Sequence, residues 1–186
     1  MPEKAALAGG ERYRLLYCAP SNKITERGVA AMTDSDRKAI ARMKCRDIMT
    51  KNVRTATSKS PLKEIAALMR DGDMGAVPIV DDGKLIGIVT DRDIVVRAVA
   101  EGLDPSDQVG RAMTRELFIA GPDDFVFEAV RLMGEKQIRR IPVVGSSGEL
   151  SGIISMADIA LETEDDLEIA ETLEEISTGT GFWGRH

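Results

Sequence analysis

The sequence predicts an α/β protein of the α+β type, in which two strand-helix-strand-strand-helix units pack as a pseudo-two-fold pair. Its first support is a repeat: Pro78 and Pro142 occupy matching positions 64 residues apart, whereas Gly83 and Gly148 are 65 apart. The register therefore slips by one residue, within a glycine turn. Its second support is that both copies pass through the same order of β-type and helix-type spacing. Duplicated units that fold together are expected to enclose two equivalent clefts.

The repeat divides the chain into four parts. Residues 1–43 form an arm, 44–103 the first unit, 108–162 the second unit, and 163–186 an acidic C-terminal helix with a mobile tail. The arm is predicted to be poorly ordered or partner-dependent before a short helix near its end. The acidic segment is predicted to be a solvated helix, and a partner or dimer helix is the alternative.

Each unit is predicted to open with a short strand, because apolar and polar residues alternate there. A first helix follows, with Ser60-Pro61 supplying a hydroxyl cap and a first-turn proline in unit one, and Asp124 supplying the cap in unit two. The alternating strand residues are Val53 and Thr55 in unit one and Leu117 and Ile119 in unit two.

Two apolar runs separated by a glycine turn then predict a β-hairpin in each unit. The runs are residues 77–80 and 85–89 in unit one, and 141–144 and 150–154 in unit two. A second helix closes each unit, and its apolar positions are Ile94, Val95, Ala98 and Val99 in unit one and Ile159, Ala160 and Leu161 in unit two.

Composition excludes several classes of function. The net charge of −6 argues against a nucleic-acid binder, and no apolar run approaches the roughly 20 residues of a membrane span. Cys18 and Cys45 are too far apart for a disulfide framework or a metal site, so we expect a cytoplasmic protein. His186 is the only histidine. Without the usual acid-base and metal-ligand residues, we expect no enzyme, no catalytic residues, no metal and no covalent cofactor.

Each unit resembles a cystathionine β-synthase (CBS) domain, over about Cys45 to Leu161. The resemblance implies a free-standing Bateman module, often doubled into a disk-shaped homodimer, that regulates an unidentified partner protein. It also implies an adenosine-containing ligand: AMP, ADP, ATP, S-adenosylmethionine or NAD. The residues that carry it are Met49-Thr50 and Met113-Thr114, the runs Val77-Pro78-Ile79-Val80 and Ile141-Pro142-Val143-Val144, and the closing segments Gly87 to Asp93 and Gly152 to Asp158.

Two hydroxyl-and-acid pairs are candidate ligand contacts, Thr90 with Asp93 and Ser155 with Asp158. Each pair stands where a strand ends and a helix begins, so unpaired N–H groups and a partial positive charge favour an anion there. The hydroxyl suits a phosphate oxygen, and the carboxylate suits a ribose diol. The alternative is a capping box that only stabilises the helix start, and both roles are compatible.

Arg139-Arg140 precedes the first hairpin strand of unit two and suits bidentate phosphate binding. The alternative is a surface pair that bridges to acids such as Glu135. The equivalent residues of unit one, Gly75-Ala76, are small and leave room for a flat base.

The resemblance implies that each cleft draws on both units. An interaction or dimerisation module, with clefts empty or plugged by side chains such as Met156, is the alternative function. One expected site combines Ser155 and Asp158 with Arg139, Arg140, Thr50, Val53, Met74, Gly75 and Ala76, and the other combines Thr90 and Asp93 with Thr114, Leu117 and Ile138.

Overall fold

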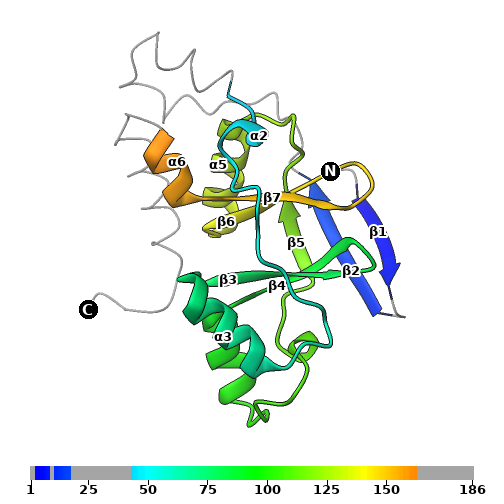
Figure 1. Cartoon of the computed structure of the whole chain (residues 1–186). Helices are drawn as coiled ribbons and strands as arrows, with labels where there is room; N and C mark the ends of the chain where they lie inside the picture. Colours follow the sequence, from blue (N-terminus) through cyan, green and yellow to red (C-terminus); the bar gives the residue numbers. More distant parts are fainter. Residues whose placement is uncertain (1–2, 9–10, 18–42, 163–186) are drawn as a thin grey trace, which may run out of the picture.

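The computed structural model describes residues 3–8, 11–17 and 43–162, and it has two stacked halves (Figure 1). Its mixture of helices and strands confirms the predicted α+β class. The upper half in Figure 1 holds α2 (Cys45–Ile48), α5 (Val126–Lys136), β6 (Arg140–Val144), β7 (Leu150–Ser155) and α6 (Met156–Glu162). The lower half holds α3 (Leu62–Gly72), β3 (Ala76–Asp81) and β4 (Lys84–Thr90), with α4 (Asp91–Asp93) and the π-helix η1 (Ile94–Val99) following β4.

Both predicted hairpins are confirmed. β3 pairs antiparallel with β4, and β6 pairs antiparallel with β7. In each hairpin the register shifts at the same point, between Ile79 and Val80 and between Val143 and Val144. The first hairpin turns through Asp82 and Gly83, both with positive φ, which is the geometry that favours glycine in a two-residue turn.

The predicted side-chain caps of the first helices are wrong. The residue before α3 is Pro61 and the residue before α5 is Phe125, and backbone carbonyls of the opposite unit's lead-in satisfy the first-turn donors. The Leu62 N–H donates to the Asp107 carbonyl at 2.9 Å, and the Val126 N–H donates to the Met43 carbonyl at 3.0 Å. The two donors, Leu62 and Val126, are 64 residues apart in sequence, and so are the two acceptors, Asp107 and Met43. The two contacts are therefore pseudo-symmetric.

The two packed bodies do not coincide with the two sequence repeats. Cys45, at the start of unit one, is fully buried in the core of the upper half, whose other buried residues all belong to unit two. Conversely, Val109 and Met113, at the start of unit two, lie in the core of the lower half. Thr50 pairs with Ile153 and Thr114 pairs with Ile88, so each lead-in segment bridges to the hairpin of the other unit. We call this arrangement the reciprocal exchange.

Ionic contacts reinforce the reciprocal exchange. Lys44 and Arg46, beside and within α2, approach the carboxylate of Asp123 in unit two at 3.0 and 2.6 Å. The hydrogen bond from Lys44, together with the positive charge of Arg46, lowers the pKa of Asp123.

The repeated methionines and glycines are partners across this exchange. A Cβ atom placed on Gly152 would lie 2.7 Å from the Met49 sulfur and 2.8 Å from the Thr50 carbonyl oxygen. A Cβ atom on Gly87 would lie 2.6 Å from the Met113 sulfur. Each lead-in therefore packs directly on the backbone of the other unit's hairpin, and glycine is the residue that permits this approach.

The predicted strands at the start of the units have different outcomes. Residues 52–55 form no strand although they lie within the described range, so the prediction at Val53 and Thr55 is wrong. In unit two the prediction is confirmed as β5 (Glu116–Ile119).

β5 pairs in parallel with β2 (Glu11–Tyr17), and β2 pairs antiparallel with β1 (Glu3–Ala8). The prediction of poor order is therefore wrong for these arm residues, while the acidic C-terminal segment lies outside the described residues.

The second helix of unit one does not bury the predicted apolar stripe. Of the four predicted positions, Ala98 is buried, whereas the side chains of Val95 and Val99 are 60% and 68% exposed. Val96 adds a third exposed valine, at 52%. The six-residue turn of η1 is a π-helix, in which side-chain spacing differs from the α-helical period assumed for the stripe.

Within the described ranges, no helix is long and apolar enough to cross a bilayer.

Candidate functional site

A pocket of about 430 Å³ opens between the two units, beside the end of β4. Unit one contributes the end of β4 and the start of α4, including Thr90 and Asp93. Unit two contributes β5 and the segment that leads from α5 into β6, including Arg139 and Arg140. The pocket is therefore made of both repeats, as expected.

The structure brings together the five residues expected at one cleft: Thr90, Asp93, Thr114, Leu117 and Ile138 all line this pocket. The polar members come from β4, α4 and the lead-in of unit two. The apolar members come from β5 and the end of the α5 connection. The pocket therefore combines polar side chains from both units with the apolar side chains of Leu117 and Ile138, as ligand pockets commonly do.

Arg139 and Arg140 line the same pocket, whereas the sequence argument grouped them with Ser155 and Asp158. Arg140 is the first residue of β6 and is paired with Ser155 across the hairpin. Its guanidinium reaches towards unit one, because a Cβ atom on Gly75 would lie 3.3 Å from its Nη2 atom.

Neither guanidinium has a hydrogen-bond or ion-pair partner within residues 43–162. The acid considered as a surface partner, Glu135, is instead 3.5 Å from the guanidinium of Arg131. Two cationic groups therefore stand on the pocket wall with their donors open to a ligand.

Thr90 and Asp93 form a complete capping box. The Thr90 N–H and hydroxyl donate to Asp93 Oδ2 at 2.9 and 2.7 Å, and the Asp93 N–H donates to Thr90 Oγ1 at 3.1 Å. The other carboxylate oxygen is 3.5 Å from Arg97 Nε, and Arg97 Nη1 donates to Thr114 Oγ1 at 2.9 Å. Arg97 thus links the two units beside the pocket.

Ser155 and Asp158 form the matching box, with corresponding distances of 2.7, 2.7 and 3.2 Å. The other residues expected at that cleft differ in exposure, and they do not line the pocket described above. Ala76 is buried, and Met74 packs against the core of the lower half. Val53 is half-buried and Thr50 exposed.

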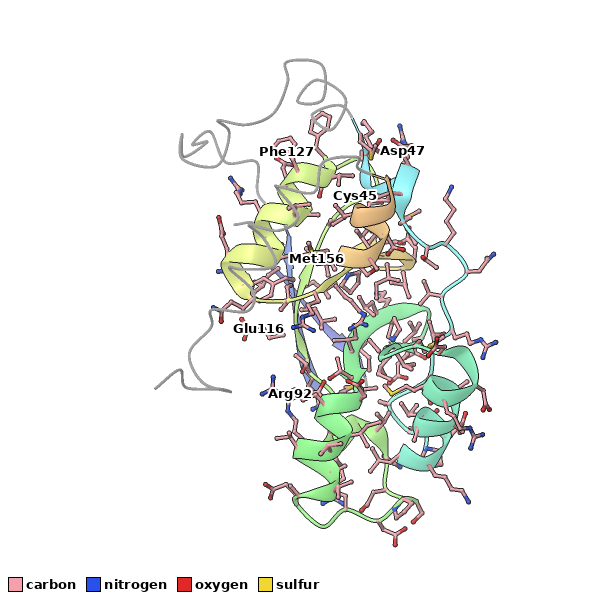
Figure 2. All side chains as sticks on the ribbon, turned by 90° about the vertical axis from the view of Figure 1, so that its left-hand side faces the viewer. Cys45, Asp47, Arg92, Glu116, Phe127 and Met156 are labelled. Atoms are coloured by element: carbon pink, nitrogen blue, oxygen red, sulfur yellow. The ribbon has the colours of Figure 1, made fainter. Side chains whose placement is uncertain are left out.

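The two units differ at the residue directly after the hydroxyl. In unit one this residue is Asp91, which lines the pocket. In unit two it is Met156, whose side chain is buried in the upper core beside Cys45 (Figure 2). The second unit therefore lacks a polar group that the first unit has beside its capping box.

Seven lining residues were not among the expected site residues: Ile88, Asp91, Arg92, Glu116, Phe118, Gln137 and Pro142. Glu116 and Phe118 flank Leu117 in β5, where successive side chains point to opposite faces. Gln137 ends α5 in the left-handed conformation, a backbone position that the helix spacing did not reveal. Figure 2 shows Glu116 and Arg92 on the same side of the molecule, between its two halves.

The fold and this pocket define a class of protein, a tandem α+β repeat module with a binding cleft shared by its two units. A family model for the CBS domain matches residues 45–99 and 109–164. The chain therefore belongs to the CBS domain family and carries two such domains in tandem.

Known proteins agree with this assignment. The CBS domain-containing protein YhcV of Bacillus subtilis (strain 168) is 36% identical over 132 residues, covering 71% of this chain and 94% of YhcV. The structure of Hypoxic Response Protein I with two coordinated zinc ions is 37% identical, covers 64% of this chain and 98% of its own, and has a TM-score of 0.59.

The CBS domain pair of protein MJ0100, in complex with 5′-methylthioadenosine and S-adenosyl-L-methionine, is also similar. It is 30% identical, covers 64% of this chain and 94% of its own, and has a TM-score of 0.59. With respect to zinc, no group of three or more His, Cys, Asp or Glu side chains in the described part of this chain could hold a metal ion.

Proposed function

We propose that this protein is a cytoplasmic regulatory module that binds an adenosine-containing compound and signals its presence to a partner protein. The observation that carries the proposal is the pocket itself, which Thr90 and Asp93 of unit one line together with Arg139 and Arg140 of unit two. The complex of the related MJ0100 pair with two adenosine compounds supports this ligand class.

The pocket residues have distinct roles in the proposal. Arg139 and Arg140 bind a phosphate, because guanidinium groups form charge-assisted, often bidentate, hydrogen bonds to phosphate oxygens. Asp93 accepts hydrogen bonds from the ribose hydroxyls, and the apolar side chains of Leu117 and Ile138 enclose the base. AMP, ADP, ATP and NAD carry the phosphate, whereas S-adenosylmethionine would use the ribose and base contacts.

The second cleft is a further candidate site in this proposal. Its residues are Ser155, Asp158, Thr50, Val53, Met74, Gly75 and Ala76. Because its Met156 is buried where the first cleft has Asp91, we expect it to bind more weakly.

Ligand binding at a pocket built from both units stabilises one relative arrangement of the units. A ligand shifts such an equilibrium only by its difference in affinity for the two arrangements. A coupling of about 1–3 kcal/mol is typical of this kind of regulation. The role is regulatory rather than catalytic, and the signal reaches the partner through this change.

Isothermal titration calorimetry with AMP, ADP, ATP, NAD and S-adenosylmethionine tests the proposal. We expect at least one compound to bind, and the Asp93→Ala variant to bind it about tenfold more weakly, equivalent to one charge-assisted hydrogen bond. Asp158→Ala removes the matching capping box of the second cleft, and we expect it to weaken binding less, because that cleft is the weaker of the two candidate sites. If the parent protein binds none of these compounds, the sensing function is rejected.

An exposed apolar face favours a second function, dimerisation. Val95, Val96 and Val99 are all more than half exposed on η1, so the face is open for a partner. We propose that two copies of the chain pair through these valines as a homodimer.

Analytical ultracentrifugation should therefore show a dimer for the parent and a monomer for Val95→Asp/Val99→Asp, because two buried carboxylates oppose association. Ala66→Asp, at an exposed position of α3, is the control and should remain dimeric. A parent that is monomeric at all concentrations would contradict the dimer.

A further inference from the structure

Strand β5 forms one wall of the pocket and depends on a strand from outside both repeats. Glu116, Leu117 and Phe118, three of its four residues, line the pocket. All four residues of β5 are paired in parallel with residues 14–17 of β2. In the described sheet β5 occupies one edge, and β2 is its neighbour.

The first unit shows what happens to the same segment without such a neighbour. Residues 52–55 are the counterparts of 116–119 in the repeat, and their alternating pattern also predicts a strand. They form none, although they lie within the described range. An extended backbone needs partners for its N–H and C=O groups. The pairing with β2 is therefore what distinguishes the β5 segment from its counterpart.

β2 is docked by side chains as well as by its backbone. Leu15 is 4% exposed and belongs to the core of the lower half, which also contains Leu117. Leu16 is 6% exposed and lies opposite Phe118 in the register. Successive strand side chains point to opposite faces, so β2 is covered on both faces at this point.

We propose that the β1–β2 hairpin is a positioning element of the pocket. It holds Glu116, Leu117 and Phe118 in the extended conformation that lines the pocket, so docking of the hairpin and binding of ligand stabilise each other. The hairpin lies outside the two segments that match the CBS domain model. It therefore modulates ligand binding at a pocket that the two CBS domains already contain. The coupling part of this inference rests on the proposed function.

The experiment uses the full chain and three variants of Leu16. Leu16→Asp places a charge at a buried position and should undock the hairpin, Leu16→Ala is a milder change in case the first fails to fold, and Leu16→Ile is the conservative control. AMP is the probe. We expect about tenfold weaker AMP binding by Leu16→Asp, a smaller loss by Leu16→Ala, and parental affinity for Leu16→Ile.

Amide hydrogen exchange supplies a readout that needs no ligand. The amides of residues 116–119 should exchange faster in Leu16→Asp than in the parent, and AMP should slow exchange at residues 14–17 of the parent. The melting temperature shows whether the rest of the fold is intact.

The outcomes separate the two proposals. If the parent binds AMP and Leu16→Asp binds it equally well, the positioning role is overturned while the site stands. If the parent binds no AMP, the coupling is overturned and exchange at 116–119 alone decides whether the hairpin orders β5. Unchanged exchange there in a folded Leu16→Asp variant overturns the positioning role in either case.

Discussion

Replacing Gly152 by alanine is expected to lower the free energy of unfolding by about 1–3 kcal/mol, the usual cost of overpacking a close contact. The new Cβ atom would lie 2.8 Å from the Thr50 carbonyl oxygen and 2.8 Å from Met49 Cγ. The carbonyl belongs to backbone that pairs with Ile153, so it cannot move away without breaking that bridge. Urea unfolding, followed by circular dichroism, measures the change.

Two comparisons sharpen this prediction. Gly87→Ala should cost less, because its nearest backbone oxygen is 3.1 Å away and the closest atom is the flexible sulfur of Met113. Adding Met49→Ala to Gly152→Ala should recover only part of the loss, since the Thr50 carbonyl remains in place. The control is Ser146→Ala, in the exposed turn of the same hairpin. Equal urea midpoints for Gly152→Ala and this control would show that Gly152 does not pack tightly on Met49 and Thr50.

Replacing Arg140 by methionine is expected to weaken AMP binding by about 10- to 100-fold, the value of a hydrogen bond to a charged group. Methionine keeps an unbranched apolar stem, so the change removes charge and donors with little loss of packing. The guanidinium lies on the pocket wall and reaches towards Gly75 of unit one, so its loss removes a contact across the cleft.

Calorimetry with AMP and with adenosine separates the contribution of the phosphate. Adenosine lacks the phosphate, so its affinity should be the same for the parent and Arg140→Met. Arg70→Met is the matched control, because Arg70 is highly exposed and pairs with Asp71 at 2.7 Å, away from the pocket. Equal losses for AMP and adenosine would mean that Arg140 shapes the pocket rather than binds phosphate.

The hairpins and the helix-start pairs followed from the sequence because their signals are local. Asp82 and Gly83 favour the turn, and Thr90 lies three residues before Asp93, the spacing of a capping box. These elements depend on contacts between neighbours in the chain, and periodicity reports such contacts directly.

Contacts between distant segments were not predictable in this way. Met49 and Gly152 each belong to a motif that the sequence repeats. Nothing in their spacing showed that the two residues touch across the two units. Equally, β5 and its counterpart at 52–55 have similar patterns, and the difference between them comes from β2, more than 90 residues away in the chain. The family resemblance grouped Arg139 and Arg140 with Ser155 and Asp158, whereas both arginines line the pocket that contains Thr90 and Asp93.

The reciprocal exchange means that a single repeat could not complete its own core. One repeat alone would leave its lead-in methionine without the glycine it packs against, and its hairpin without the segment that bridges to it. A chain of one repeat would complete its core only by pairing with a second, identical chain. The covalent link between the two repeats supplies that partner at every protein concentration. Two repeats of one chain also need not be identical, and in this protein only the second unit carries the two arginines.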